Sequence, residues 1–175
     1  MSADRRDRSG RGATFAIRPE RPNDVAAIRA LLRAAFADAP HSDGTEAAIV
    51  DALRGDGDLA LSLVAEAGEV VAHVAFSPVA VGGEREGWFG LGPVCVRSDR
   101  RRRGIAAALI GEGLDRLRAR GVRGCVLIGD PAFYARFGFR AGSLSWRDVP
   151  PKFVQGLAFG GPAPAGEIAY APAFG

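Results

Sequence analysis

One stretch near the middle of the chain, Val94–Ile110, constrains the fold more than any other. It opens with the β-branched residues Val94 and Val96, which are typical of a buried strand. Four consecutive arginines, Arg100–Arg103, and then Gly104 follow this apolar run. Beyond the glycine, apolar residues recur at helical spacing: Ala106, Ile110, Leu114 and Leu117. The stretch therefore predicts a strand, a basic loop and a helix in direct succession.

A basic loop at the start of a helix is suited to binding an anion. The first backbone N–H groups of a helix have no intrahelical partner and carry the positive end of the helix dipole, so a phosphate group can accept several hydrogen bonds there. Gly104 lets a ligand approach the backbone, and Ala106 and Ala107 keep the first turn narrow. Arginine side chains add charge and paired donors. We therefore expect a phosphate or pyrophosphate site here.

The spacing Arg101-x-x-Gly104-x-Ala106 resembles the Arg/Gln-x-x-Gly-x-Gly/Ala signature of the GNAT superfamily of acyl-CoA N-acyltransferases. In that family the loop amides bind the pyrophosphate of coenzyme A, and the preceding strand binds the pantetheine arm. The resemblance implies acetyl-CoA or coenzyme A as the cofactor. It assigns the cofactor contacts to the strand and to the loop with its first helical turn: Val94, Cys95, Val96, Arg101, Arg102, Arg103, Gly104, Ile105, Ala106 and Ala107.

A second motif, Tyr134-x-x-x-Gly138-Phe139, is similar to the Tyr-x-x-x-Gly-Phe signature of the same family. In many members that tyrosine lies near the coenzyme A sulfur and acts as general acid, so the resemblance implies this role for Tyr134. It also places Tyr134 and Arg136 among the cofactor contacts. On the residues alone, a buried tyrosine that only packs is the alternative. The family's upstream asparagine has no counterpart, because Asp130 stands too close to the tyrosine.

The base that deprotonates the amine is less well marked. Glu46 and His73 are the candidates we select, with Glu84 and Glu86 in a loop as others. His73 alternates with apolar neighbours and is more often structural in such a context. His41 lies in a loop and faces either substrate or solvent. Several GNAT proteins remove the proton through water, so the resemblance does not require a single base.

A covalent intermediate on Cys95 is not expected. Holding donor and acceptor side by side supplies the proximity that direct attack needs. The resemblance assigns stabilisation of the oxyanion to backbone N–H groups near Val94 and Cys95.

The remaining sequence supplies the elements around these motifs. A helix-start signal at Pro22–Asp24 precedes one amphipathic helix, and a second helix is expected near Glu46, with Asp43 and Glu46 as a capping pair. The expected strands are Thr14–Arg18, Leu59–Glu66, Val70–Val81, Trp88–Val96, Cys125–Ile128, one from Phe139 and a last one at Glu167–Tyr170. The fold class is therefore mixed α/β (α+β), a GNAT fold with a mostly antiparallel central sheet and flanking helices.

Composition sets the limits of this interpretation. A chain of 175 residues is one domain, which we place at residues 14–175, after a polar tail of residues 1–13 expected to be disordered. No apolar run is long enough to span a bilayer, and the N-terminus lacks the apolar segment of a secretory signal. Cys95 and Cys125 are expected to be free and buried in a reducing cytoplasm rather than bound to a metal.

Three functions remain after these considerations. We favour an acetyltransferase that acts on a primary amine by direct attack in a ternary complex. A non-catalytic acyl-CoA-binding regulatory module is the alternative, and a nucleic-acid binder using Arg100–Arg103 is disfavoured because no aromatic residues interleave the basic ones. The tail Ser145–Gly175, together with the segments Phe76–Pro78 and Leu91–Pro93, is similar to a bacterial GNAT subgroup. The acceptor stays open among small amines, peptide N-termini and lysine side chains, and a homodimer is possible.

Overall fold

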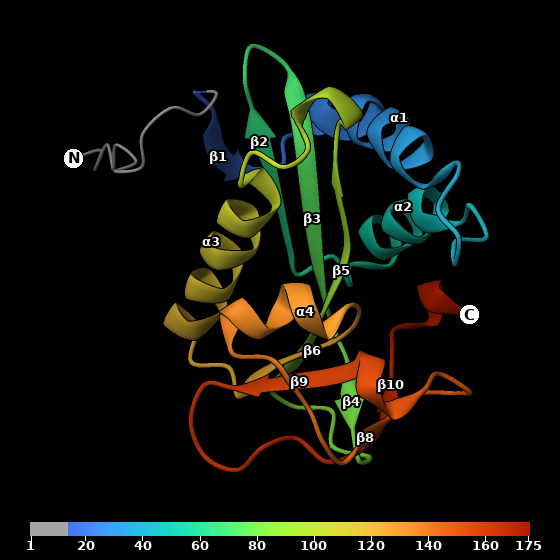
Figure 1. The fold of residues 1–175 in the computed structure, drawn as a ribbon, viewed down its shortest axis with the longest axis vertical. Coiled ribbons are helices and arrows are strands. Elements are labelled where there is room, and N and C mark those ends of the chain that lie inside the picture. The colour runs from blue at the N-terminus through green and yellow to red at the C-terminus, as the bar shows by residue number, and fades with distance from the viewer. Residues whose placement is uncertain (1–13) are drawn as a thin grey trace.

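The computed structural model describes residues 14–175, and the tail predicted at residues 1–13 lies outside this range. Two sheets and the helices around them make up the fold (Figure 1). The helices are α1 (Val25–Phe36), α2 (Glu46–Asp56), α3 (Ile105–Ala119) and the short α4 (Pro131–Tyr134). The strands are β1 (Ala16–Pro19), β2 (Leu61–Glu66), β3 (Val70–Pro78), β4 (Ala80–Val81), β5 (Trp88–Val96), β6 (Gly124–Ile128), β7 (Arg140–Ala141), β8 (Leu144–Ser145), β9 (Val154–Ala158) and β10 (Gly166–Ala169).

The larger sheet has seven strands in the order β1-β2-β3-β5-β6-β9-β7. Every neighbouring pair in it is antiparallel except β5 and β6, which are parallel. The smaller sheet has the order β4-β10-β8. The expected mixed α/β class with a mostly antiparallel sheet is therefore confirmed.

Two features of the sheets differ from the sequence prediction. The run Val70–Val81 is not one strand: it divides into β3 and β4, which belong to different sheets. Strands β8 and β9 are not predicted at all, although β9 pairs with β6 along its whole length. Its sequence, Val154–Ala158, contains a glutamine and a glycine and gives little strand signal, so its pairing with β6 decides its conformation.

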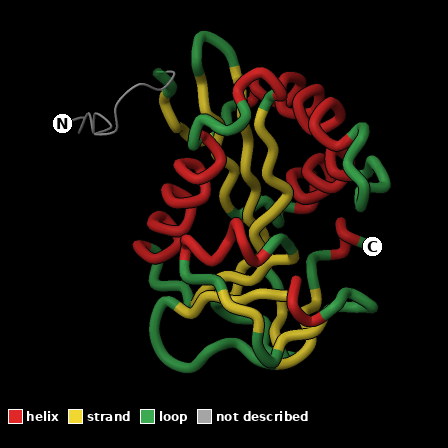
Figure 2. The backbone as a smooth tube through the Cα atoms, in the orientation of Figure 1, coloured by secondary structure: helices red, strands yellow, loops and turns green. Residues whose placement is uncertain are grey.

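Helices cover both faces of the larger sheet (Figure 2). On one face α3 packs through Ile105, Leu109 and Ile110 onto Leu63 and Phe76. On the other face a second set of buried residues joins α1 and α2 to the sheet: Ile28, Leu32, Val50, Val64, Ala75 and Cys95. The division follows the alternation of side chains along each strand, since Val64 and Ala75 face α1 and α2 while Leu63 and Phe76 face α3.

The start of α2 corrects a detail of the sequence prediction. Asp43 and Glu46 do not form a capping pair, and the N-cap residue Thr45 makes no side-chain cap bond. Asp43 instead accepts a hydrogen bond from the Thr45 N–H at 3.1 Å, closing its own turn. Glu46 accepts a hydrogen bond from the Ser42 hydroxyl at 2.6 Å. Within residues 14–175, no helix is long and apolar enough to cross a membrane.

The contact between α3 and the sheet depends on a missing side chain. A Cβ atom at Gly113 would overlap the ring of Phe76, which is fully buried. Gly111, on the same helix, has no heavy atom within 4 Å of the position its Cβ would occupy. The two glycines therefore form a matched pair: packing leaves no room for a side chain at Gly113, whereas Gly111 has room for one.

We expect Gly113→Ala to destabilise the protein by about 1–3 kcal/mol, because the added methyl overpacks the core against Phe76. Gly111→Ala is expected to stabilise it by about 0.5–1 kcal/mol through helix propensity. Urea unfolding of both variants measures the difference. Equal effects of the two substitutions would contradict this account of the packing.

Candidate functional site

Strands β5 and β6 separate within the sheet, and this separation creates the site. They pair only from Trp88 to Gly90 on β5, opposite Gly124 to Val126 on β6. Beyond Gly90, β5 continues against β3 while β6 continues against β9. Within residues 14–175, the edge of β5 from Leu91 to Val96 therefore has no strand partner on the β6 side. Apart from the Val96 carbonyl, which accepts a hydrogen bond from Arg101 Nε at 3.4 Å, the backbone groups on this edge are available for a ligand, as those of an unpaired strand edge are in general.

The loop after β5 leads into the N-terminus of α3. Gly104 adopts a left-handed conformation, with φ of 76°, and provides no side-chain cap to the helix. The first helical hydrogen bond runs from the Ala108 N–H to the Gly104 carbonyl, at 3.0 Å. The N–H groups of Ile105, Ala106 and Ala107 precede that bond and have no helical acceptor. The predicted anion site therefore has the expected backbone geometry.

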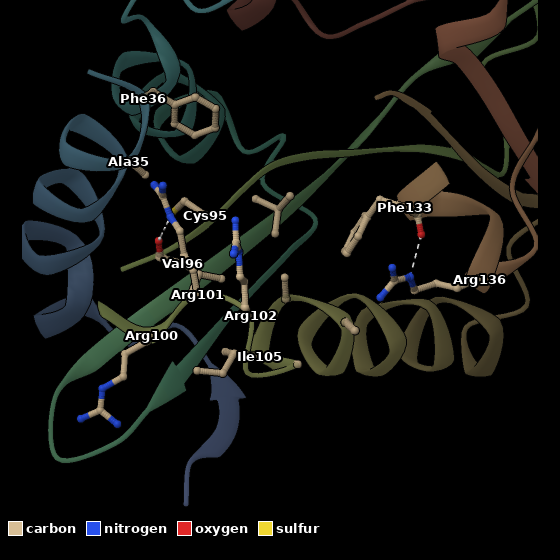
Figure 3. A pocket seen from close by; sticks show the side chains of 14 residues that line it. Ala35, Phe36, Cys95, Val96, Arg100, Arg101, Arg102, Ile105, Phe133 and Arg136 are labelled. Atoms are coloured by element: carbon tan, nitrogen blue, oxygen red, sulfur yellow. Dashed lines mark hydrogen bonds between the residues drawn. The ribbon is translucent and has the colours of Figure 1, made fainter. Parts of the chain in front are cut away.

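A cavity of about 550 Å³ lies beside this helix start. Among the residues that the structure describes, its lining includes arginines but no aspartate or glutamate. Figure 3 shows Arg101 and Arg102 on one side of it, and Phe133 and Arg136 on the other. The lining residues are Ala35, Phe36, Val94, Cys95, Val96, Arg100, Arg101, Arg102, Gly104, Ile105, Ala106, Ala107, Phe133 and Arg136. The cavity is thus positively charged at both ends and apolar between them.

Most of the cofactor contacts expected from the sequence meet at this cavity. Arg103 and Tyr134 are the two that do not line it. The sequence prediction missed Ala35 and Phe36, which come from the end of α1, as well as Arg100 and Phe133. Phe36 is recognisable in the sequence only as part of an apolar helix face. Nothing local indicates that the end of this helix reaches the loop after β5.

Arg136 is held in place by its neighbour Phe133. Its Nε donates a hydrogen bond to the Phe133 carbonyl at 2.8 Å. Its guanidinium carbon lies 4.4 Å from the centre of the Phe133 ring, which is a cation–π contact. These two contacts fix a positive charge on the cavity wall opposite the arginine loop (Figure 3).

Cys95 lies in the cavity wall but is a poor nucleophile. Burial raises the pKa of its thiol to about 12, although the backbone of His73 and the charge of Arg101 partly oppose the shift. The reactive thiolate is therefore scarce at neutral pH. This agrees with the expectation that Cys95 forms no covalent intermediate.

Tyr134 is positioned by the short helix α4, whose start is marked in the sequence by Asp130 and Pro131. Asp130 caps α4 by accepting a hydrogen bond from the Ala132 N–H at 2.9 Å, and Pro131 occupies the first helical turn. The ring of Tyr134 packs edge-on against Phe133 at 4.9 Å and Phe139 at 6.0 Å. Burial raises the pKa of its phenol to about 12. The hydroxyl therefore keeps its proton at neutral pH, which is the form that a general acid requires.

The structure does not bring the two candidate bases, Glu46 and His73, to the cavity. Glu46 lies in the first turn of α2 and is bonded to Ser42. His73 is fully buried on β3, and its Nε2 lies 2.8 Å from the Ser62 hydroxyl, which donates to Glu20. Since that hydroxyl proton points to Glu20, Nε2 carries the imidazole proton and donates it to Ser62.

The other candidates also lie elsewhere. Glu84 forms an ion pair with Arg123, away from the arginine loop. Neither Glu86 nor the exposed His41 lines the cavity. No group of acidic, histidine or cysteine side chains in residues 14–175 is arranged to bind a metal.

The buried His73 predicts a pH dependence of stability. Burial lowers its pKa to about 4, and the charge of Arg54 adds to the decrease while Glu20 opposes it. Between pH 6.5 and 4 the unfolded chain therefore binds a proton that the folded protein does not. The free energy of unfolding should fall as the pH decreases through this window, by at most about 1.4 kcal/mol per pH unit.

We expect His73→Gln to reduce that slope, measured by urea unfolding at pH 7, 6 and 5. His41→Gln, which changes the chain's other histidine, is the control and should leave the slope as it is. An unchanged slope in the His73 variant would contradict the assignment of this proton to His73.

Comparison with known proteins identifies the family. Residues 16–142 match the Acetyltransferase (GNAT) domain. The chain belongs to the GNAT family of acetyltransferases. An Escherichia coli K12 relative, the uncharacterized N-acetyltransferase YhbS, is 48% identical over 125 residues, which are 70% of this chain and 72% of that protein.

Two solved GNAT structures are similar to this one over nearly the whole chain. A GNAT acetyltransferase from Brucella melitensis in complex with acetyl-CoA has a TM-score of 0.84 and 49% identity, covering 93% of this chain and 99% of its own. YhbS from Escherichia coli in complex with CoA has a TM-score of 0.83 and 36% identity, covering 96% of each chain. The GNAT fold expected from the sequence is therefore confirmed.

Proposed function

We propose that this GNAT acetyltransferase moves an acetyl group from acetyl-CoA to a primary amine by direct attack, with both substrates bound at once. The proposal is supported by one continuous binding surface. The open edge of β5 leads into a basic cavity at the uncapped N-terminus of α3. Two related acetyltransferases bind CoA or acetyl-CoA, which supports the choice of donor.

The charge of the cavity suits coenzyme A. Its pyrophosphate and 3′-phosphate together carry roughly four negative charges at neutral pH. Arg101 and Arg102, with the N–H groups of the first turn of α3, would hold the pyrophosphate. The backbone of Val94–Val96 would hold the pantetheine arm, and Arg136 would add charge from the opposite wall. When bound, acetyl-CoA supplies the acetyl thioester.

Tyr134 would donate its proton to the departing sulfur. Its burial favours the protonated phenol, and the capped α4 and the surrounding aromatic rings hold its ring in one orientation. We leave Glu46 and His73 out of the mechanism, because neither lines the cavity and both are bonded to other groups. The amine proton would then pass to water. The two buried free cysteines favour a reducing, cytoplasmic location.

We expect Gly104→Val to weaken CoA binding at least about tenfold, measured by calorimetry with CoA and desulfo-CoA. A β-branched residue is strained at this left-handed φ, and its side chain would stand where the phosphate approaches the backbone.

Gly57→Val is the matched control for this substitution. Like Gly104, Gly57 has a left-handed conformation, with a φ of 79°, and no heavy atom lies within 4 Å of its Cβ position; Gly57, however, ends α2. Gly57→Val should lower the free energy of unfolding by a similar amount and leave the CoA affinity unchanged. Absence of CoA binding in the wild type, or an equal loss in both variants, would contradict the proposed site.

We expect Tyr134→Phe to lower kcat by about 100-fold, within the usual range for loss of a general acid, without weakening CoA binding. The assay follows release of free coenzyme A thiol from acetyl-CoA with a panel of primary amines: spermidine, benzylamine, Nα-acetyl-lysine and a short peptide. Equal rates in variant and wild type would exclude Tyr134 as the proton donor. No acetylation of any amine by a CoA-binding wild type would favour the regulatory module.

A further inference from the structure

We propose that Tyr170 and Ser77 bind the acceptor amine, at the point where β5 and β6 separate and on the sheet face opposite Tyr134. This inference rests on the proposed acetyl transfer. It assigns acceptor binding to two residues that lie outside both sequence motifs.

Both tyrosines of the chain lie near the point of separation. Gly90 is the last residue of β5 that pairs with β6, and a Cβ atom placed on it would lie 2.7 Å from Cε1 of Tyr170. Gly129, directly after β6, likewise leaves room for the ring of Tyr134. Both rings therefore lie against glycines at, or shortly after, the point where the two strands separate.

The two rings approach from opposite faces of the sheet. Tyr134 packs with the cluster that joins α3 to the sheet. Tyr170 covers Gly90, whose partner across the strands is Ser77. Ser77 follows Phe76, which faces α3, so its side chain points to the face covered by α1 and α2. Ser77, Gly90 and Tyr170 therefore lie together on the α1 and α2 side.

Ser77 has an unused hydrogen-bonding group at this place. Its residue is 0% exposed, and its hydroxyl has no hydrogen-bond partner among residues 14–175. A buried hydroxyl without a partner destabilises a fold, and such groups are uncommon in native proteins. A ligand that supplies the missing partner would explain the serine, since an alanine would fit the same space without that cost.

The phenol of Tyr170 is held in a fixed position. Its ring packs against Trp146, with centroids 5.3 Å apart, and against Phe174 at 4.9 Å. The 3-10 helix Pro172–Phe174 packs in turn against α2, and Arg147 donates hydrogen bonds to the carbonyls of Phe174 and Gly175. Such support reduces the entropy lost when the hydroxyl binds a ligand.

These hydroxyls suit an uncharged amine. Burial raises the pKa of Tyr170, so the phenol stays protonated and does not act as a base. Its oxygen and that of Ser77 can each accept a hydrogen bond from an amine N–H, which leaves the nitrogen lone pair free to attack. The amine would then reach the acetyl carbon from one face of the sheet, while Tyr134 would approach the coenzyme A sulfur from the other.

A fluorine NMR experiment tests the geometry without a known acceptor. Because the chain has two tyrosines, 3-fluorotyrosine labelling gives two resonances, which Tyr134→Phe and Tyr170→Phe assign. Desulfo-CoA, which lacks the sulfur and the acetyl group, should shift neither strongly. Acetonyl-CoA, a stable ketone analogue of acetyl-CoA, should shift both. A shift of Tyr134 alone would overturn the acceptor-binding proposal, whereas the absence of any CoA binding would overturn the proposed function instead.

Kinetics with the best amine of the panel test the role. Tyr170→Phe and Ser77→Ala should each raise the KM for the amine roughly three- to tenfold, the usual effect of losing one neutral hydrogen bond. The KM for acetyl-CoA should stay within about twofold, because neither substitution removes a hydrogen bond to acetyl-CoA. Ser143→Ala, which removes an exposed serine hydroxyl outside the proposed site, is the control and should change neither value. An unchanged amine KM in both hydroxyl variants would refute the proposal.

Discussion

The separation of β5 from β6 is the constraint on which the rest of the site depends. Each of these strands keeps an antiparallel partner on its outer side, β3 for β5 and β9 for β6, while the parallel pair between them holds for only three register positions. Parallel pairing is slightly weaker than antiparallel pairing, and this parallel pair ends at Gly90. The exposed edge of β5 then supplies the backbone groups that an extended ligand requires.

Missing side chains shape this site as much as those that are present. Gly104 bends the chain into α3 without covering its first N–H groups, and Gly90 and Gly129 leave the space that the two tyrosine rings occupy. The glycines therefore determine where the polar groups lie. The rings themselves supply hydroxyls that burial keeps protonated.

Charge is divided between scaffold and site. Ion pairs link Arg29 of α1 to Asp51 of α2, Asp51 to Arg54, and Arg54 to Glu20, the residue directly after β1. Beside the arginine loop, Arg97 is paired with Glu69 and Asp99. The cavity itself has arginines and no carboxylate among the described residues that line it. The carboxylate of Asp99 lies 3.7 Å from Nε of the lining residue Arg100 and is itself not part of the lining.

The sequence by itself determined the features whose signals are local. The β-branched strand, the arginine loop with Gly104, and the capped turn that carries Tyr134 each depend on residues within one short segment, and the resemblance to the GNAT family rests on the same segments. Only the tertiary structure decided which distant segments meet: β9 beside β6, Phe36 at the arginine loop, and Tyr170 against Gly90. It also placed His73 inside the protein instead of at the cavity. Such contacts arise from strand pairing and packing between segments far apart in the chain, for which a residue's sequence neighbours give no signal.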